Sequence, residues 1–453
     1  MQQVSFEPPT QERPPPSLRA NFRWTLAGNL VYSLCQWGML SVLAKVGNAS
    51  MVGQFALGLA ISAPVFMFTN LALRAVQVTD GSREYRFADY FTLRLLTTTL
   101  GLLVVAILVF VSRYDPGTQG VILLLALAKF IECLSDVIGG LLQLHEHLDQ
   151  AAVSLMIRGA LSILAFSATF LSSHSLFAST AAMCVAWLGV FIGYDLRRAK
   201  DMLAPGEPYV HFVWQVERKL VLLALPLGFV TMLLSLNGNI PRYLLERFGG
   251  PAQLGIFASL AYVLLTVSTV VNALGQSAIV RLSSMFAAGD LDGFAGLIFK
   301  LVGMGVAATL VGLPLSALLG RTALTLLYRP EYGEHMRAFL IMVAAGGVGA
   351  VASFLGYGVT TARRFHAQIP VTAACTLTTV VVTTLLVPHH KLAGAAVGLL
   401  ASAIVLAVGY ALVLLVTIAK ARKTQSMAGE SATCARASRI ANRDQIHTRS
   451  LGP

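Results

Sequence analysis

The chain has 453 residues, of which 56% are hydrophobic and only 12% are charged, and its formal net charge is +12. Soluble domains carry about 25% charged residues, so this composition excludes an ordinary soluble enzyme or a solvated binding domain. The basic residues are spread along the chain rather than gathered on a soluble unit, so the positive charge predicts no nucleic-acid partner.

Apolar stretches long enough to cross a membrane recur along the chain. A hydrocarbon core of about 30 Å needs roughly 20 apolar residues. Charged or Pro/Gly-rich breaks separate such stretches, which lie at residues 22–44, 51–72, 91–111, 119–142, 152–171, 176–195, 219–240, 254–278, 295–318, 336–358, 368–387 and 391–418. The sequence therefore predicts an all-α integral membrane protein with about twelve transmembrane helices.

Polar segments lie at both ends of the chain and between its halves. Residues 1–18 are Pro-rich and lack the apolar core of a signal peptide, which predicts a disordered tail. Residues 420–453 form a second, basic tail, and residues 201–218 a polar linker. With an even number of spans both tails share one side, and that side carries more than twice as many Lys and Arg residues as the other. The positive-inside rule therefore places both tails in the cytoplasm.

The sequence resembles itself at an offset of 202 residues, over the hairpins that begin its two halves. The aligned pairs are Gly47 with Gly249, Gly53 with Gly255, Phe55 with Phe257, and Asn70 with Asn272. Because the offset covers an even number of helices, both halves enter the membrane from the same side. We therefore expect two parallel six-helix bundles, over residues 19–200 and 219–419, around a central cavity. Parallel repeats of this kind are typical of alternating-access transporters.

The aligned residues also have structural interpretations. Gly53 and Gly255 lack a side chain, so they predict a close approach between helices. Asn70 and Asn272 lie at equivalent depths, where they either line the cavity or form hydrogen bonds across helices.

Charged side chains inside the predicted spans mark either a packing pair or a transport path, because an unpaired charge in hydrocarbon costs several kcal/mol. Lys129, Glu132 and Asp136 fall at positions i, i+3 and i+7 of one helix and so share one polar face. Three further cations lie in other spans, at Arg94, Arg158 and Lys300. Asp136, Arg158 and Lys300 lie roughly 9 Å from the cytoplasmic ends of their helices and Arg94 lies slightly shallower, which would allow one cluster.

Four cations in this set face only two acids, Glu132 and Asp136. A positive excess along the cavity favours an anionic substrate such as a phosphate or pyrophosphate, with the two acids pairing with the cations or tuning them. Arg281, near the cytoplasmic end of its helix, is a further candidate contact. The alternative interpretation is structural, with Asp136 serving only as an ion-pair partner for Arg158 or Arg94.

The sequence contains no motif for catalysis or for a cofactor. His145 and His147 form an H-x-H pair without further ligands nearby. The five cysteines follow no disulfide or zinc pattern. We therefore expect no metal, no cofactor and no catalytic residue.

The spans, the duplication and the hairpin over residues 22–75, with its Gly47, Gly53 and Phe55, resemble the polysaccharide-transporter (Wzx-like O-antigen flippase) family. The resemblance covers residues 19–419 and extends to the superfamily that includes multidrug and toxin extruders. It implies that the chain moves an undecaprenyl-pyrophosphate-linked oligosaccharide from the cytoplasmic to the periplasmic leaflet of the bacterial inner membrane. The cationic cavity would receive the pyrophosphate and anionic sugars. The implied partners are membrane lipids and components of polysaccharide polymerisation or export.

Two other functions stay open. An ion-coupled multidrug-type exporter would use Glu132 or Asp136 as its titrating group, although the first span has no acid. A membrane glycosyltransferase or polymerase is less favoured, because the longest external loops, near residues 241–253 and 319–335, are too short to hold a domain. We therefore expect a transporter rather than an enzyme, and a flippase first.

Overall fold

The computed structural model describes residues 18–79, 85–112, 114–204, 206–362 and 364–449. Within these ranges the chain is helical and forms no strand. The elements are α1 (Leu18–Val46), α2 (Ala49–Thr69), α3 (Leu73–Thr79), α4 (Phe87–Val111), α5 (Pro116–Leu144), α6 (Leu148–Ser173), α7 (Leu176–Val190), the π-helix η1 (Phe191–Asp195), α8 (Leu196–Met202), α9 (Trp214–Ala287), α10 (Leu291–Leu327), the 3-10 helix η2 (Pro330–His335), α11 (Met336–Thr361) and α12 (Phe365–Arg449).

Helical segments cover every predicted span, with ends that differ by a few residues. Eight helices of the described chain are long and apolar enough to cross a membrane. α9 and α12 each join two predicted spans across a single non-helical residue, Gly250 in α9 and Lys391 in α12. The predicted class, an all-α membrane protein, is therefore confirmed.

The expected external loops are shorter than the sequence suggested. α9 stays helical through residues 241–249 and breaks only at Gly250, whose φ of 78° is accessible to glycine without strain. α10 likewise continues to Leu327, and η2 occupies most of the segment between α10 and α11. The sequence boundaries were set where charges begin, but a helix can continue past the hydrocarbon because long basic side chains reach the headgroups.

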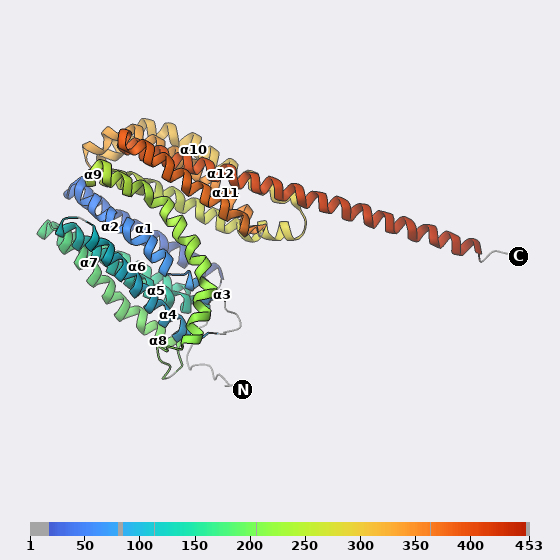
Figure 1. Cartoon of the computed structure of the whole chain (residues 1–453), viewed down its shortest axis with the longest axis horizontal. Coiled ribbons are helices and arrows are strands. Elements are labelled where there is room, and N and C mark those ends of the chain that lie inside the picture. Colours follow the sequence, from blue (N-terminus) through green and yellow to red (C-terminus); the bar gives the residue numbers. More distant parts are fainter. Residues whose placement is uncertain (1–17, 80–84, 113, 205, 363, 450–453) are drawn as a thin grey trace.

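The helices form two lobes (Figure 1). The first lobe consists of α1 to α8, and the second consists of α10 to α12 with residues 251–287 of α9. Residues 214–249 of α9 run between the lobes and pack along α2, where the Tyr243 hydroxyl donates to the Ala60 carbonyl and the Thr231 hydroxyl to the Met67 carbonyl. The first half of α9 is therefore the physical connection between the lobes.

The internal repeat appears in the structure as a reciprocal contact between α2 and α9. A Cβ atom added to Gly53 would lie 1.7 Å from the Pro251 carbonyl oxygen, and one added to Gly255 would lie 1.9 Å from the Ala49 carbonyl oxygen. Pro251 follows Ala49 by the same offset of 202 residues that relates the two glycines. Each glycine thus packs on the backbone of the other repeat, and the predicted close approach is confirmed.

The lobes are also joined by hydrogen bonds near this crossing, at what we call the closed end, which carries the turn between α1 and α2 and the segment 326–332. The Trp37 indole donates to the Tyr328 hydroxyl at 3.1 Å, and the Lys45 ammonium donates to the Leu326 carbonyl at 3.0 Å. Arg329 donates to the Lys45 carbonyl at 3.2 Å. In Figure 1 the lobes diverge toward the other end, where α1 begins and α12 extends beyond the body of the molecule.

Candidate functional site

The polar face of α5 takes part in three of the ion pairs of the first lobe. Lys129 and Glu132 pair with each other at 2.6 Å, one turn apart on the same helix. Further along the helix, Gly140 leaves room for α3, since a Cβ atom there would lie 2.2 Å from the Gln77 side chain. α3 therefore packs directly against the charged stripe of α5.

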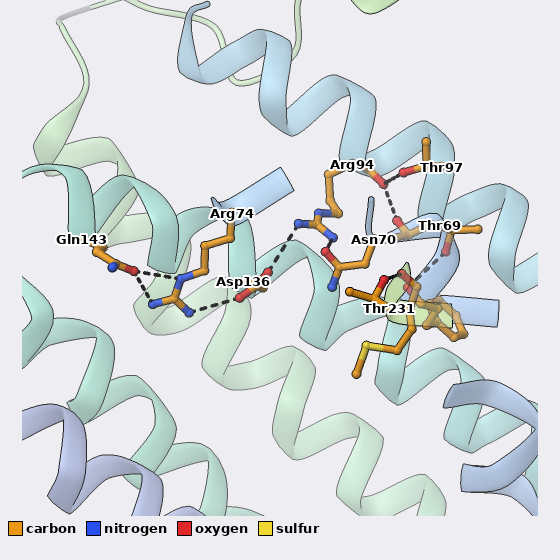
Figure 2. Close-up of polar contacts among 11 residues, drawn as sticks. Thr69, Asn70, Arg74, Arg94, Thr97, Asp136, Gln143 and Thr231 are labelled. Atoms are coloured by element: carbon orange, nitrogen blue, oxygen red, sulfur yellow. Dashed lines mark hydrogen bonds and ion pairs between the residues drawn. The ribbon is translucent and has the colours of Figure 1, made fainter. Parts of the chain in front are cut away.

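Asp136 lies between two arginines from different helices (Figure 2). Its carboxylate accepts from Arg74 at 3.1 Å and from Arg94 at 3.3 Å. Arg94 is fully buried and also donates to the Asn70 side chain, whereas Arg74 is 36% exposed and donates twice to Gln143, at 3.0 and 3.1 Å. One carboxylate thus serves two guanidinium groups.

Arg158 does not pair with Asp136. The structure places it against Asp195, at 3.0 Å, with both side chains almost fully buried. The Ser154 hydroxyl also donates to Asp195, and the guanidinium lies 5.6 Å from the centre of the Trp187 ring. Of the two structural pairings considered from the sequence for Asp136, the structure contains the one with Arg94.

Sequence reasoning missed Asp195, which stood at the very end of a predicted span. The π-helix η1 over Phe191–Asp195 is the local reason for its position, because the wider turn changes the direction in which the last side chain points. Ser154 and Arg158 on the preceding span were the available signal in the sequence, but their spacing alone could not place them beside Asp195.

Sequence reasoning also missed Arg74, which lies just beyond the predicted span 51–72. α2 ends at Thr69, and the chain turns through Leu71 and Ala72, both with φ near +50°, before α3 begins. This turn directs the α3 side chains onto α5, where Arg74 contacts Asp136. A left-handed conformation at two non-glycine residues leaves no recognisable signal in the sequence.

Two of the predicted cations lie outside this network. Lys300 is exposed on α10 in the second lobe, and Arg281 is exposed near the end of α9. Asn272 lies in α9, but its side chain falls outside the described residues, so its predicted equivalence with Asn70 stays a prediction. Cations at similar predicted depths in the membrane therefore do not all belong to one cluster, because the two lobes are separate helical bundles.

The ion pairs in the structure change the balance of positive and negative charges that the sequence predicted for the site. The cations of the network are Arg74, Arg94, Lys129 and Arg158, and its acids are Glu132, Asp136 and Asp195. The expected positive excess is thus reduced to a single charge. That excess is located at Asp136, because the other two acids each pair with one cation.

Cavities lie on both sides of this network. One of about 430 Å³ is bounded by α2, α3, α5 and α9, and its walls include Asn70, Arg74, Asp136, Gln143 and Thr231. The described residues around it thus combine a guanidinium and a carboxylate with neutral amide and hydroxyl groups.

A second cavity, of about 200 Å³, lies where α1, α2, α5 and α7 meet the second half of α9. Its walls combine aromatic rings with polar groups, among them Tyr32, Gln36, Lys129, Trp187 and Tyr262. A smaller cavity of about 180 Å³ is lined by Asn70, Glu132 and Asp136. It therefore shares lining residues with both of the larger cavities.

The histidine pair noted in the sequence shows no metal-binding arrangement. His147 is buried and lies 3.8 Å from Asp149, and His145 contacts the Leu141 carbonyl. Among the described residues there is no group of three or more His, Cys, Asp or Glu side chains that could hold a metal ion.

Solved structures with the same architecture define the class of fold. An inward-facing multidrug resistance MATE family transporter of the MOP superfamily superposes with a TM-score of 0.68 at 13% identity, over 87% of this chain and 95% of that one. An outward-facing MATE family transporter of the MOP superfamily gives a TM-score of 0.56 at 11% identity, over 89% and 95%. The chain therefore has the MATE transporter fold, and the inward-facing form is the better match of these two.

One sequence relative adds a biological context. The capsular polysaccharide biosynthesis protein CapF of Staphylococcus aureus is 28% identical over 391 residues, which cover 86% of this chain and 97% of the relative. No protein-family model matches the sequence. The chain is thus similar along most of its length to a protein of polysaccharide biosynthesis and has the fold of a transporter.

Proposed function

We propose that the chain is a flippase that moves an undecaprenyl-pyrophosphate-linked oligosaccharide, a surface polysaccharide or O-antigen repeat unit, across the membrane by alternating access. The observation that carries the proposal is the sharing of Asp136 between Arg74 and Arg94 at the wall of the 430 Å³ cavity. The similarity to a capsular polysaccharide biosynthesis protein supports a saccharide cargo.

The anionic part of the substrate would bind at Arg74. This guanidinium is partly exposed to the cavity and shares its carboxylate partner with Arg94, so it retains unsatisfied positive charge. A phosphate group can accept two parallel hydrogen bonds from a guanidinium, which is a geometry that lysine cannot offer. Asn70 and Thr231 line the same cavity and could hydrogen-bond further phosphate oxygens.

The saccharide would use the 200 Å³ cavity. Aromatic rings there present flat apolar faces, and Gln36 with Ser33 offers donors and acceptors for hydroxyl groups. Its volume is below the range of about 300–1,000 Å³ of pockets for drug-sized ligands, which suits one sugar ring better than a large drug. Tyr262 comes from the second half of α9, so a bound sugar would contact both lobes.

Transport would then follow from the contacts between the lobes. The conformation described has its closed end at the turn between α1 and α2, and in this scheme, which the distribution of basic residues supports, that end faces the periplasm. Opening it requires loss of the Trp37–Tyr328 and Lys45–Leu326 hydrogen bonds. In this scheme the protein spans the bacterial inner membrane with both termini in the cytoplasm, and polymerase or export components receive the cargo.

Multidrug export is the second candidate, since the best-matching transporter named above is a multidrug resistance protein. In that case Glu132 would carry the coupling ion, although in this conformation it is paired with Lys129. The drug susceptibility of a strain that lacks the chain separates the two functions, because a saccharide flippase predicts unchanged susceptibility.

The flippase proposal is tested with Arg74→Gln in a strain whose own copy is deleted. Charge-assisted hydrogen bonds contribute about 1.5–3 kcal/mol, so we expect surface polysaccharide to fall about 10- to 100-fold at equal amounts of membrane-inserted protein. Arg198→Gln is the matched control, because the Arg198 side chain is 43% exposed and its ion-pair partner, Asp201, lies outside the network. Unchanged polysaccharide with Arg74→Gln would contradict the proposal.

A further inference from the structure

A buried acid that forms no ion pair with the network of α5 lies at the beginning of α9. Glu217 precedes the predicted span 219–240 and is only 3% exposed. Both of its carboxylate oxygens are buried and have no hydrogen-bond partner in the described part of the chain. A buried carboxylate without a donor is unfavourable when ionised, so this one requires a proton or a change of position.

The surroundings of Glu217 come from α4 and the linker. Asp89, in the first turn of α4, accepts from the Arg86 backbone N–H at 2.9 Å and lies 3.4 Å from the His211 ring. The His211 backbone N–H donates to the Thr92 hydroxyl at 2.8 Å, which fixes the linker to α4 immediately before α9 begins.

The charges near Glu217 do not neutralise it. On its own helix Arg218 and Lys219 are exposed, and on α4 the Arg86 side chain is also exposed. The carboxylate of Asp89 repels a negative charge on Glu217. Burial first, and Asp89 second, raise the pKa of Glu217 to about 7.

We propose that the buried, unpartnered carboxyl group of Glu217 holds a proton beside Asp89, and that this proton keeps the beginning of α9 docked on α4 in the conformation described. Loss of the proton leaves two buried, negatively charged carboxylates that repel each other, which favours separation of α9 from α4. Because residues 214–249 of α9 connect the lobes, undocking of this end frees the second lobe to move relative to the first. This role of Glu217 concerns the lobes alone and does not depend on the identity of the cargo.

The direction of the pH dependence follows from the docked and free states. Free in water, a glutamate has a pKa of about 4.5, and docking raises that of Glu217 to about 7. The docked state therefore binds the proton more tightly and is most favoured below pH 4.5. Its population relative to the undocked state falls up to about tenfold per pH unit between these values and levels off above them.

The test is the distance between spin labels at Gln215→Cys on α9 and Glu146→Cys on the first lobe, in full-length protein with its native cysteines replaced and reconstituted in lipid nanodiscs. Both labelled positions are exposed. We expect the short, docked distance at pH 5 and a longer one at pH 8. Glu217→Gln should keep the docked distance at both values, whereas Glu334→Gln, an exposed glutamate at the closed end, should respond like the parent protein.

Two further variants keep the test decisive. Asp89→Asn removes the repulsion and should move the midpoint to lower pH, which can be measured even if Glu217→Gln does not fold. His211→Gln should leave the response in place. A pH response that survives in Glu217→Gln, or that is lost only in His211→Gln, would overturn the proposal, as would a parent protein whose distance is the same at pH 5 and pH 8.

Discussion

α5 and α11 occupy the same place in the two halves of the chain, each as the fourth predicted span, and they differ in charge. α5 carries Lys129, Glu132 and Asp136 along one face. α11 carries a single charged residue, Arg337, in its first turn, and is otherwise apolar or weakly polar. The duplicated architecture therefore does not require charge on this helix, and among the described side chains the charged network lies in the first lobe.

The difference separates what builds the fold from what builds the site. Where α2 crosses α9, each of the two glycines packs on backbone atoms of the other repeat and the contact involves no charged group. The network of α5 adds buried and partly buried ion pairs, which contribute little net stability because desolvation offsets their attraction. A costly feature confined to one lobe is best explained by function.

The largest effect should come from Asp136→Leu. It leaves two guanidinium groups without their shared partner, and breaking a buried ion pair typically costs about 3–5 kcal/mol. We expect a large fall in the thermal unfolding temperature of purified protein and loss of polysaccharide export. The double variant Asp136→Leu with Arg94→Leu should recover part of the stability but none of the export, and equal stability of single and double variants would contradict the shared role of Asp136.

A smaller effect is expected where the two repeats touch. Gly255→Ala adds a Cβ atom 1.9 Å from the Ala49 carbonyl oxygen, so the helices must separate at a cost of about 1–3 kcal/mol. Spin labels at the exposed positions Ser173 and Leu319, on opposite sides of the closed end, should move apart. Gly303→Ala is the control, since nothing lies within 4 Å of its added carbon. Equal distances in both variants would show that the crossing does not hold the lobes together.

The smallest effect is expected for Lys300→Gln in the second lobe. Its side chain is exposed on α10 and lines none of the cavities described above, so stability should change by less than about 0.5 kcal/mol. Export of surface polysaccharide, measured beside Arg74→Gln, should stay at the parental level. A loss as large as that of Arg74→Gln would mean that the second lobe contributes charge to the path after all.

Much of the fold could be predicted from the sequence because it depends on the length and polarity of segments. Every predicted span coincides with a helical segment, and the glycine pairs found by self-alignment do lie at a close helix contact. The errors are at helix ends, as at residues 241–249, where charge in the sequence did not end the helix.

The site was predicted less completely, since it depends on the direction of individual side chains. The sequence singled out Arg94, Asp136 and Arg158, which form ion pairs in the structure, but it missed their partners Arg74 and Asp195. Arg74 and Asp195 reach the cluster through a left-handed turn and a π-helix, two local departures that follow from no residue pattern. Lys300 was included because its predicted depth in the membrane matches that of the other cations. Depth alone does not specify in which lobe a residue lies.

The reciprocal contact of Gly53 and Gly255 also has an evolutionary consequence. Each glycine faces main-chain atoms, so no smaller side chain on the partner helix can compensate for a substitution at either position. Selection on these two sites is thus independent of cargo, whereas Arg74 and its neighbours are free to diverge with it. Homologues that carry different substrates should therefore retain both glycines while their polar residues vary. An alignment of such proteins would show the two glycine positions unchanged and the residues that line the cavity substituted.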